Sequence, residues 1–229
     1  MRGFDHINTW VFDLDNTLYP ASCKLFDQMH VRMSDFIKER LNVDQTEALR
    51  LRREYYLKHG TTLRGLMLEH DMEPADFLDY VHNIDYSAVA NDTTLQNALA
   101  KLPGRKLVFT NGTTGHAGRV MKRLGVEDQF EAVFDIVDSN YIPKPARGPY
   151  DKFASLHAVD GSRTAFFEDL AENLNAPHAM GMTTVLITSD IRHSDLSNAA
   201  NRLDHIHHST HDLPQFLSGI VQSLHGVKQ

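Results

Sequence analysis

Cysteine and long apolar runs are scarce in this sequence. Cys23 is the only cysteine among 229 residues, so no disulfide can form within the chain, which suits a reducing compartment. Nowhere do about eighteen apolar residues follow one another, so a membrane-spanning helix of ordinary length is not expected. The N-terminal residues also lack the apolar core of a signal peptide. We therefore expect a soluble, cytoplasmic protein without a membrane partner.

Clusters of basic residues are absent as well. Lys and Arg number 23 against 30 Asp and Glu, which argues against a nucleic acid polymer as partner but not against a single nucleotide. A catalytic role for Cys23 is disfavoured, because only Lys24 stands beside it to lower the pKa of the thiol. The remaining composition, 41% hydrophobic and 23% charged, is that of a globular chain with room for one large domain or a domain with an insert.

Hydrophobic periodicity divides the chain into two parts. In the first, which ends near Val89, apolar residues after Leu18 recur at the spacing of amphipathic helices, and no strand is indicated. Gly60 and Pro74 fit the end of one helix and the first turn of another. The helices are expected over residues 25–41, over residues 46–59, after a cap at Thr61 or Thr62, and from Pro74 onward.

The second part of the chain, from Thr93, alternates between helix and strand. Such alternation predicts a parallel sheet with helices on both faces, which is a Rossmann-like α/β core. Residues 1–18 and 93–229 would form this core, and residues 19–92 would form a helical insert after its first strand. The expected strands cover residues 7–12, 106–110, 133–137, 164–167 and 183–187, and the expected helices cover residues 95–102, 115–124, 149–157, 171–180 and 213–224.

The first expected strand ends in two carboxylates. Residues 7–12 are apolar or β-branched enough for a short buried strand, and Asp13 and Asp15 follow it. Residues two apart in an extended segment point the same way, so both carboxylates would face one point. Two like charges so close need a cation or a shared proton, which predicts metal-assisted or acid/base chemistry. The alternative is a solvated turn that caps the strand.

Other polar residues follow the later strands. Ligands of an open parallel sheet bind beyond the carboxyl ends of its strands, so groups at these ends would meet in one crevice. Their convergence weakens three plain alternatives, which are a hairpin turn, an exposed loop lysine, and acidic residues that only cap a helix. The groups are Thr110 and Asn111 after the second strand, Lys144 between two prolines, and Glu168 and Asp169 after residues 164–167.

Four motifs thus stand in order along nearly the whole chain: Asp13-Leu14-Asp15-Asn16-Thr17, Thr110-Asn111, Lys144, and Glu168-Asp169 with Asn173. By these motifs the chain resembles the phosphatases of the haloacid dehalogenase superfamily. The resemblance implies that Asp13 is a nucleophile that forms an aspartyl-phosphate, and that Asp15 is the general acid and base, with a pKa above that of Asp13. It also implies Mg²⁺ as cofactor, held by the carboxylates of Asp13 and Asp169 and the main-chain carbonyl of Asp15.

The resemblance also gives roles to the other motif residues. Thr110, together with main-chain amides around Asn111, would bind the phosphate. Lys144 would place a positive charge beside that phosphate. Glu168 and Asn173 would support the metal loop, and a direct contact of Glu168 with the metal stays open. An Asp two residues after the nucleophile favours phosphate transfer over carbon–halogen cleavage, because the superfamily's dehalogenases resemble one another in lacking it.

The insert of residues 19–92 resembles the helical cap of this superfamily, a helical bundle that closes over the substrate. Several runs are similar to the pyrimidine 5′-nucleotidase branch, which hydrolyses nucleoside 5′-monophosphates such as UMP and CMP, although Glu168-Asp169 stands where that branch has two Asp. Arg64 is the candidate for substrate contact, with His116 and Arg147 behind it. The runs are Tyr55-Tyr56 through Leu66, Phe77 to His82, Phe109 to Gly112 with His116-Ala117, and Phe166 to Asp169.

Other interpretations stay open at this point. The cap could select sugar phosphates or phosphoglycolate, and a phosphosugar mutase would use the same two Asp but protect its aspartyl-phosphate from water. A binding module without activity is disfavoured by the intact motifs. The sequence does not decide whether the chain forms a homodimer. Four histidines could bind a transition metal, but their alternation with Ile206 favours a solvent-facing strand. They are His205, His207, His208 and His211.

Overall fold

A six-stranded sheet forms the centre of the structure, a computed structural model that describes residues 3–189 and 204–226. Every neighbouring pair of strands runs parallel, and β1 lies in the middle between β2 and β4. From edge to edge the strands are β3 (Ala132–Phe134), β2 (Arg105–Phe109), β1 (Thr9–Phe12), β4 (Thr164–Glu168), β5 (Thr183–Ile187) and β6 (His208–Thr210).

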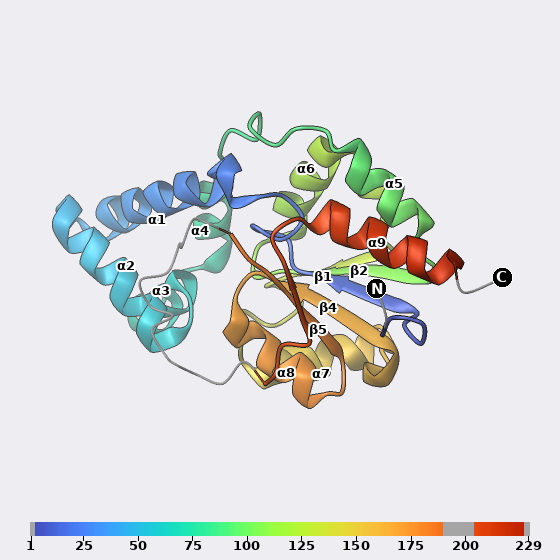
Figure 1. The fold of residues 1–229 in the computed structure, drawn as a ribbon. Coiled ribbons are helices and arrows are strands. Elements are labelled where there is room, and N and C mark those ends of the chain that lie inside the picture. Colours follow the sequence, from blue (N-terminus) through green and yellow to red (C-terminus); the bar gives the residue numbers. More distant parts are fainter. Residues whose placement is uncertain (1–2, 190–203, 227–229) are drawn as a thin grey trace.

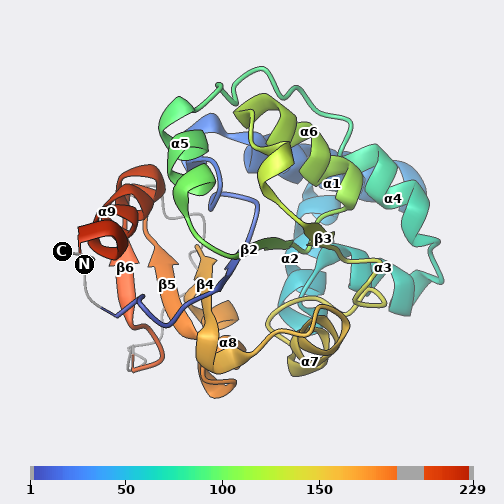
Figure 2. The ribbon, with the colours of Figure 1, turned by 90° about the vertical axis from the view of Figure 1, so that its right-hand side faces the viewer.

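Helices cover both faces of this sheet. They are α1 (Leu25–Leu41), α2 (Gln45–His59), α3 (Thr62–His70), α4 (Pro74–Val81), α5 (Thr93–Lys101), α6 (Thr114–Leu124), α7 (Arg147–Leu156), α8 (Asn175–Ala179) and α9 (Leu213–Gly226). Figures 1 and 2 show α5, α6 and α9 over one face and α7 and α8 over the other. The arrangement confirms the predicted α/β class with a Rossmann-like parallel sheet.

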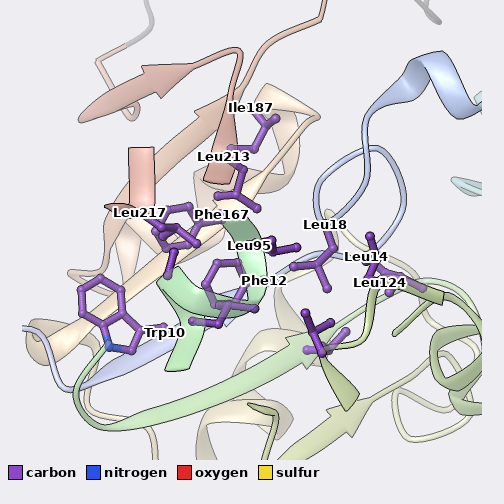
Figure 3. Packing of buried hydrophobic residues seen from close by; sticks show 14 of the residues in the cluster. Trp10, Phe12, Leu14, Leu18, Leu95, Leu124, Phe167, Ile187, Leu213 and Leu217 are labelled. Carbon is purple, nitrogen blue, oxygen red and sulfur yellow. The ribbon is translucent and has the colours of Figure 1, made fainter. Parts of the chain in front are cut away.

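Alternating side chains of β1 fill the two layers of the core. Trp10 and Phe12 pack with residues of α5, α6 and α9, while Val11 packs on the opposite face with residues of α7 and α8. Phe12 stacks on Phe167 of β4 with ring centroids 4.6 Å apart, and Figure 3 shows this layer from close by. Burial of each such side chain stabilises the fold by about 1.5–3 kcal/mol. The indole nitrogen of Trp10 donates to the Pro103 carbonyl over 2.7 Å, so its polar atom is also satisfied.

Helices α1 to α4 form a core of their own. Figure 1 shows them together beside the sheet rather than over either of its faces. The side chain of Asp44 caps α2, and the side chain of Thr61, one of the two predicted caps, caps α3. Gly60 ends α2 with a φ of 86°, which a glycine adopts without strain. The division into a core of residues 1–18 and 93–229 and a cap of residues 19–92 stays a prediction. The buried members of this helical core include Met29, Phe36, Ile37, Tyr55, Leu66 and Phe77.

Strand β3 is shorter than predicted, because it ends at Phe134 rather than at residue 137. The side chain of Asp135 accepts hydrogen bonds from the amides of Val137 and Asp138 over 2.8 and 3.0 Å. These bonds close a turn directly after the strand, since Asp side chains compete with the backbone in this way.

The helix predicted over residues 171–180 is divided into a 3-10 turn at Ala171–Leu174 and the short helix α8. Pro177 explains the division in part, because it has no amide hydrogen to donate to the carbonyl of Asn173. The hydroxyl of Tyr150 donates to that carbonyl instead, over 2.7 Å. Among the residues that the structure describes, no helix is long and apolar enough to cross a membrane.

Candidate active site

Three strands place polar side chains at one edge of the sheet. Asp13 follows β1, and its amide donates to the Phe167 carbonyl over 2.9 Å, so this residue continues the ladder by one position. Thr110 follows β2, and its amide donates to the Phe134 carbonyl over 3.0 Å. Glu168 is the last residue of β4. All three side chains are buried, so any charge on them requires a partner.

Lys144 provides that partner from the loop between β3 and α7. Its buried ammonium donates to Asp13 Oδ1 over 2.7 Å, to Glu168 Oε2 over 2.6 Å and to the Phe109 carbonyl over 3.0 Å. Burial lowers the pKa of Lys144, but the charges of Asp13 and Glu168 raise it more, so the net shift is upward. The amine is therefore protonated at neutral pH, and it places a positive charge at the end of β1.

The loop that carries Lys144 is held by Asn111. The Lys144 amide donates to Asn111 Oδ1 over 2.9 Å, and Asn111 Nδ2 donates to the Lys144 carbonyl over 3.4 Å. The hydroxyl oxygen of Thr110 accepts a hydrogen bond from the Gly112 amide over 2.9 Å and keeps its own hydrogen to donate. The side chain of Asn111 therefore positions the lysine, and the groups that remain for an anion are the Thr110 hydroxyl and main-chain amides.

Three carboxylates surround this single ammonium. Ligand oxygens of Asp13, Glu168 and Asp169 lie within 4.8 Å of one another. Burial and then the charge of Glu168 raise the pKa of Asp13 against the opposing effect of Lys144, and burial and the same charge raise the pKa of Asp169. One positive charge cannot balance three ionised carboxylates, and oxygen ligands suit a hard divalent cation. The donor set thus fits Mg²⁺, with Asp13 and Asp169 among the residues that could hold it.

The side chain of Asp15 is not part of this carboxylate cluster. Its Oδ1 accepts a hydrogen bond from the Tyr19 hydroxyl over 2.5 Å and lies 2.8 Å from Nε2 of His116. Burial raises the pKa of Asp15, but His116 and Tyr19 lower it more, so it falls below its ordinary value. Among the protein groups alone, the pKa values of Asp13 and Asp15 therefore have the opposite order to the one expected from the sequence. Nothing in the motif indicates an imidazole beside Asp15.

The prediction that His116 contacts the substrate needs correction. Its side chain is fully buried, with Nε2 at Asp15 and Nδ1 2.9 Å from the Tyr86 hydroxyl. Both ring nitrogens are engaged within the protein, so the ring has no polar atom to offer a ligand. His116 lies behind Asp15 rather than on the substrate side.

The other predicted cap and loop residues also have partners. Arg64 of α3 donates from its guanidinium to the Tyr141 carbonyl over 3.3 Å, and this bond joins the predicted cap to the loop before Lys144. Arg147 is exposed and pairs with Asp151 of its own helix over 2.8 Å, so nothing draws it toward the site.

The residues predicted to support the metal loop lie around its backbone. Glu168 Oε1 accepts from the amides of Asp169 and Leu170 over 3.1 and 3.2 Å. Asn173 is buried in the 3-10 turn that follows. Asn16 Nδ2 donates to Asp169 Oδ2 over 3.5 Å and links the first motif to the last. Asp169 is therefore held by Glu168 through its main-chain amide and by Asn16 through its side chain.

A model of a known protein family matches most of the chain. The model for haloacid dehalogenase-like hydrolases matches residues 7–181. The chain belongs to this family. The match spans all four predicted motifs, so the resemblance at the level of the superfamily is confirmed, and the chain is a haloacid dehalogenase-like hydrolase.

One curated protein is similar to this hydrolase in sequence. Phosphate metabolism protein 8 of Saccharomyces cerevisiae is 31% identical to this hydrolase over 193 residues. The alignment covers 76% of this chain and 60% of that protein, so the chain spans about 60% of the length of its relative.

Solved structures of the family share the fold. A HAD phosphatase from Thermococcus onnurineus matches with a TM-score of 0.61 at 16% identity, over 93% of this chain and 98% of that one. A 2-haloacid dehalogenase from Pseudomonas syringae pv. Tomato DC3000 matches with a TM-score of 0.56 at 17% identity, over 95% and 99%. The HAD hydrolase YfnB from Bacillus subtilis, solved with bound magnesium, matches with a TM-score of 0.56 at 13% identity, over 95% and 98%. Phosphatases and dehalogenases share this fold, so the reaction must be inferred from the site.

Sequence reasoning missed three residues of the hydrolase site. Tyr19 follows shortly after the first motif and was not predicted as a site residue. Its hydroxyl, only a few residues after Asp13 and Asp15, could have indicated a contact with one of these carboxylates. His82 ends one of the runs that resemble the nucleotidase branch. Nothing in the sequence indicates that His82 or Tyr86 contacts His116, because these contacts arise only in the tertiary fold.

The late histidines do not converge on a metal in this hydrolase. His205 Nε2 lies 2.8 Å from the Ala171 carbonyl, His207 Nδ1 lies 2.8 Å from the Thr184 hydroxyl, and the His208 ring packs on Phe4. Among residues 3–189 and 204–226, the carboxylates at the sheet edge are the one group arranged to hold a metal ion. The predicted late strand exists as β6, but it begins at His208 rather than around His205.

Proposed function

We propose that this hydrolase is a Mg²⁺-dependent phosphomonoesterase that acts on nucleoside 5′-monophosphates, with pyrimidine nucleotides such as UMP and CMP preferred. The observation that carries the phosphatase assignment is the Lys144 ammonium bonded to Asp13 and Glu168 at the end of β1. A phosphate monoester is a dianion, so a carboxylate nucleophile can approach it only where positive charge is already in place. The presence of Asp15 favours phosphate transfer over dehalogenation by the resemblance described above.

The chain's own residues account for the first half of the reaction. Lys144 binds Asp13 through Oδ1, and the other carboxylate oxygen attacks phosphorus. The bond between phosphorus and the ester oxygen breaks. Asp15 must carry a proton at this step, although His116 and Tyr19 lower its pKa in the protein alone, and it gives that proton to the leaving oxygen. The Thr110 hydroxyl donates to a phosphate oxygen. Mg²⁺, when bound by Asp13, Asp169 and the Asp15 carbonyl, would neutralise charge on the phosphate and the nucleophile.

The second half of the reaction returns the enzyme to its first state. Asp15, now ionised, takes a proton from a water molecule, which attacks the phosphorus of the aspartyl-phosphate. The bond from phosphorus to Asp13 breaks, and inorganic phosphate leaves. Because one carboxylate gives a proton in the first step and accepts one in the second, its orientation must be kept throughout. Tyr19 and His116 both contact this carboxylate at Oδ1.

The nucleotide part of the proposal rests on the resemblance of the cap and on Tyr56. This tyrosine of α2 is 38% exposed. Burial raises the pKa of its hydroxyl, and the negative charges of Glu172, Asp169 and Glu168, which are near enough to act on it, raise this pKa further. An aromatic side chain at such a place can stack on a base, and stacking of this kind contributes about 1–3 kcal/mol per base. The name of the yeast relative, phosphate metabolism protein 8, agrees with phosphate chemistry in general.

Phosphate release from a panel of esters tests the proposal. The panel contains UMP, CMP, AMP, phosphoglycolate, several hexose phosphates and a hexose bisphosphate, each with Mg²⁺ or with EDTA. UMP and CMP are expected to be hydrolysed well above the others, and EDTA is expected to abolish turnover. Mg²⁺ should also raise the thermal unfolding midpoint in the absence of substrate, because a cation that binds only the folded chain stabilises it.

Tyr56→Ala provides the matched test of the nucleotide assignment. It should raise KM for UMP about 5–150-fold, which is the range that corresponds to one lost base stack, and leave KM for phosphoglycolate unchanged. Preference for phosphoglycolate or a sugar phosphate would overturn the nucleotide assignment and keep the chemistry. A requirement for a bisphosphate activator would favour a mutase, and no turnover with any ester would favour a binding module.

Asp15→Asn is expected to lower kcat by about 10²–10⁴-fold, the usual contribution of a general acid and base. With an activated ester, whose leaving group needs no proton, Asp13 should still be phosphorylated while hydrolysis is slow. Intact mass spectrometry should then detect one added phosphoryl group. The double variant Asp13→Asn/Asp15→Asn is the control and should show none. Turnover by Asp15→Asn at the wild-type rate would contradict the role of Asp15.

A further inference from the structure

His116 occupies a buried position between Asp15 and the predicted cap. It stands on α6 of the core, and its side chain is completely shielded from solvent. Nε2 lies 2.8 Å from Oδ1 of Asp15, a residue 101 positions away in the chain. Oδ1 of Asp15 can accept a hydrogen bond whether or not a proton stands on Oδ2, so the imidazole donates to it from Nε2.

Both contacts of the Asp15 side chain fall on the same oxygen. Tyr19 donates to Oδ1, and Nε2 of His116 lies at this atom as well. Oδ2 accepts no hydrogen bond from any residue that the structure describes. Two donors at one oxygen fix the plane of the carboxylate and leave the second oxygen to exchange protons with a ligand. Tyr19 alone would not fix it, because a single hydrogen bond allows the carboxylate to rotate about that contact.

Besides Asp15, His116 contacts His82 at the end of α4 and Tyr86 in the segment that follows α4. The Tyr86 hydroxyl lies 2.9 Å from Nδ1 of His116 and 2.9 Å from the carbonyl of His82. The ring of His82, at the end of α4, stacks on the His116 ring with centroids 4.6 Å apart and an angle of 11°. Two core residues fasten this end of α4, since Thr113 Oγ1 lies 3.2 Å from His82 Nδ1 and Arg119 donates to the His82 carbonyl over 3.3 Å.

We propose that His116 is a positioning residue for Asp15, and that Tyr86 and His82 hold the imidazole in the orientation that this requires. The inference rests on the proposed function, because it assumes that Asp15 exchanges protons with the ester. The inference also connects Asp15 to α4, which carries none of the four motifs. The end of α4 and its connection back to the core act on the acid and base through one ring, so their placement affects the chemical step.

Two amide substitutions separate this role from simple packing. The amide nitrogen of His116→Gln can take the place of Nε2 and still donate to Asp15, whereas that of His116→Asn takes the place of Nδ1 and cannot reach it. His116→Asn is expected to lower kcat by about 10–100-fold, the range for partners that orient a site residue. His116→Gln should retain at least several-fold more kcat than His116→Asn, and KM should be unchanged in both. Equal losses of kcat in two folded variants would overturn the proposal.

If neither His116 variant folds, Tyr86→Phe tests the proposal instead. This change removes one oxygen from a half-buried side chain, so the variant is expected to fold. It should lower kcat with KM unchanged and shift the ¹⁵N signal of His116 Nδ1. Tyr80→Phe is the matched control, since its hydroxyl bonds to Glu39 in an exposed pair and not to His116. Equal kcat and equal His116 signals in Tyr86→Phe and Tyr80→Phe would overturn the link to Tyr86.

The ¹⁵N spectrum also separates failure of the inference from failure of the proposed function. Asp15→Asn should shift the Nε2 signal of His116 whether or not any ester is hydrolysed, because the contact exists in the resting protein. No turnover by the wild type would overturn the proposed function and leave this contact to be tested by the spectrum. An unchanged Nε2 signal in Asp15→Asn would overturn the positioning contact, even in an active phosphatase.

Discussion

Asp13→Asn is expected to abolish phosphate release while the protein stays folded. An amide cannot replace the carboxylate that attacks phosphorus, and loss of an activated nucleophile costs at least about 10⁴-fold in kcat. Phosphate release from UMP and trapping of labelled enzyme measure the loss. Asp151→Asn, which removes an exposed carboxylate paired only with Arg147, is the control and should keep full activity. Normal turnover by Asp13→Asn would remove the nucleophile assignment.

The stability of Asp13→Asn follows from the charges around Lys144. The Lys144 ammonium also bonds to Glu168, over 2.6 Å. In Asp13→Asn this second carboxylate remains, so the buried ammonium keeps a negatively charged partner. Burial and Glu168 already raise the pKa of Asp13, which means that the folded protein resists the ionised form of this group. Replacement by a neutral amide relieves that cost. The thermal midpoint should therefore equal or exceed that of the wild type when both are measured in EDTA.

Lys144→Met is expected to remove both activity and much of the stability. Asp13 and Glu168 are buried and would lose the ammonium that lies 2.7 and 2.6 Å from them. Removal of one partner from a buried ion pair typically costs about 3–5 kcal/mol, because the remaining charge stays uncompensated. Urea unfolding followed by circular dichroism measures this loss. Lys152→Met is the control, since Lys152 is exposed and bonds only to Asn140.

The stability lost in Lys144→Met should depend on pH in a defined direction. The pKa of Asp13 is already raised, to about 7, by burial and Glu168, and loss of the lysine raises it further. Between the unfolded pKa of about 4 and the folded value, the folded variant binds more protons than the unfolded chain, so its stability increases as the pH falls. Because the pKa of Asp13 in the folded wild type is about 7, the deficit relative to wild type should shrink as the pH falls from 8 toward 7 and change little below that. A midpoint equal to that of Lys152→Met at pH 8 would contradict the role of Lys144 as charge partner.

The sequence by itself determined the elements and their order. Periodicity predicted α1 to its exact bounds, Leu25–Leu41, and caps predicted the start of α3, because local spacing and capping act within one or two turns. It also placed Asp13, Thr110 and Glu168 at strand ends, and parallel strands bring such ends to one edge. The bounds of β3 escaped prediction because the Asp135 side chain closes a turn that propensity does not encode.

The tertiary structure alone decided how each site residue is used. Asn111 holds the Lys144 loop through a pairing 33 residues apart in sequence, and His116 lies behind Asp15 rather than against a ligand. Neither contact follows from motif spacing, because the positions that face each other across packed elements depend on the register of the whole sheet and its helices. The pKa order of Asp13 and Asp15 has the same origin. The sequence specifies which side chains can ionise. Burial and neighbouring charges, which shift the pKa values of these side chains, arise only when segments distant in the sequence pack together.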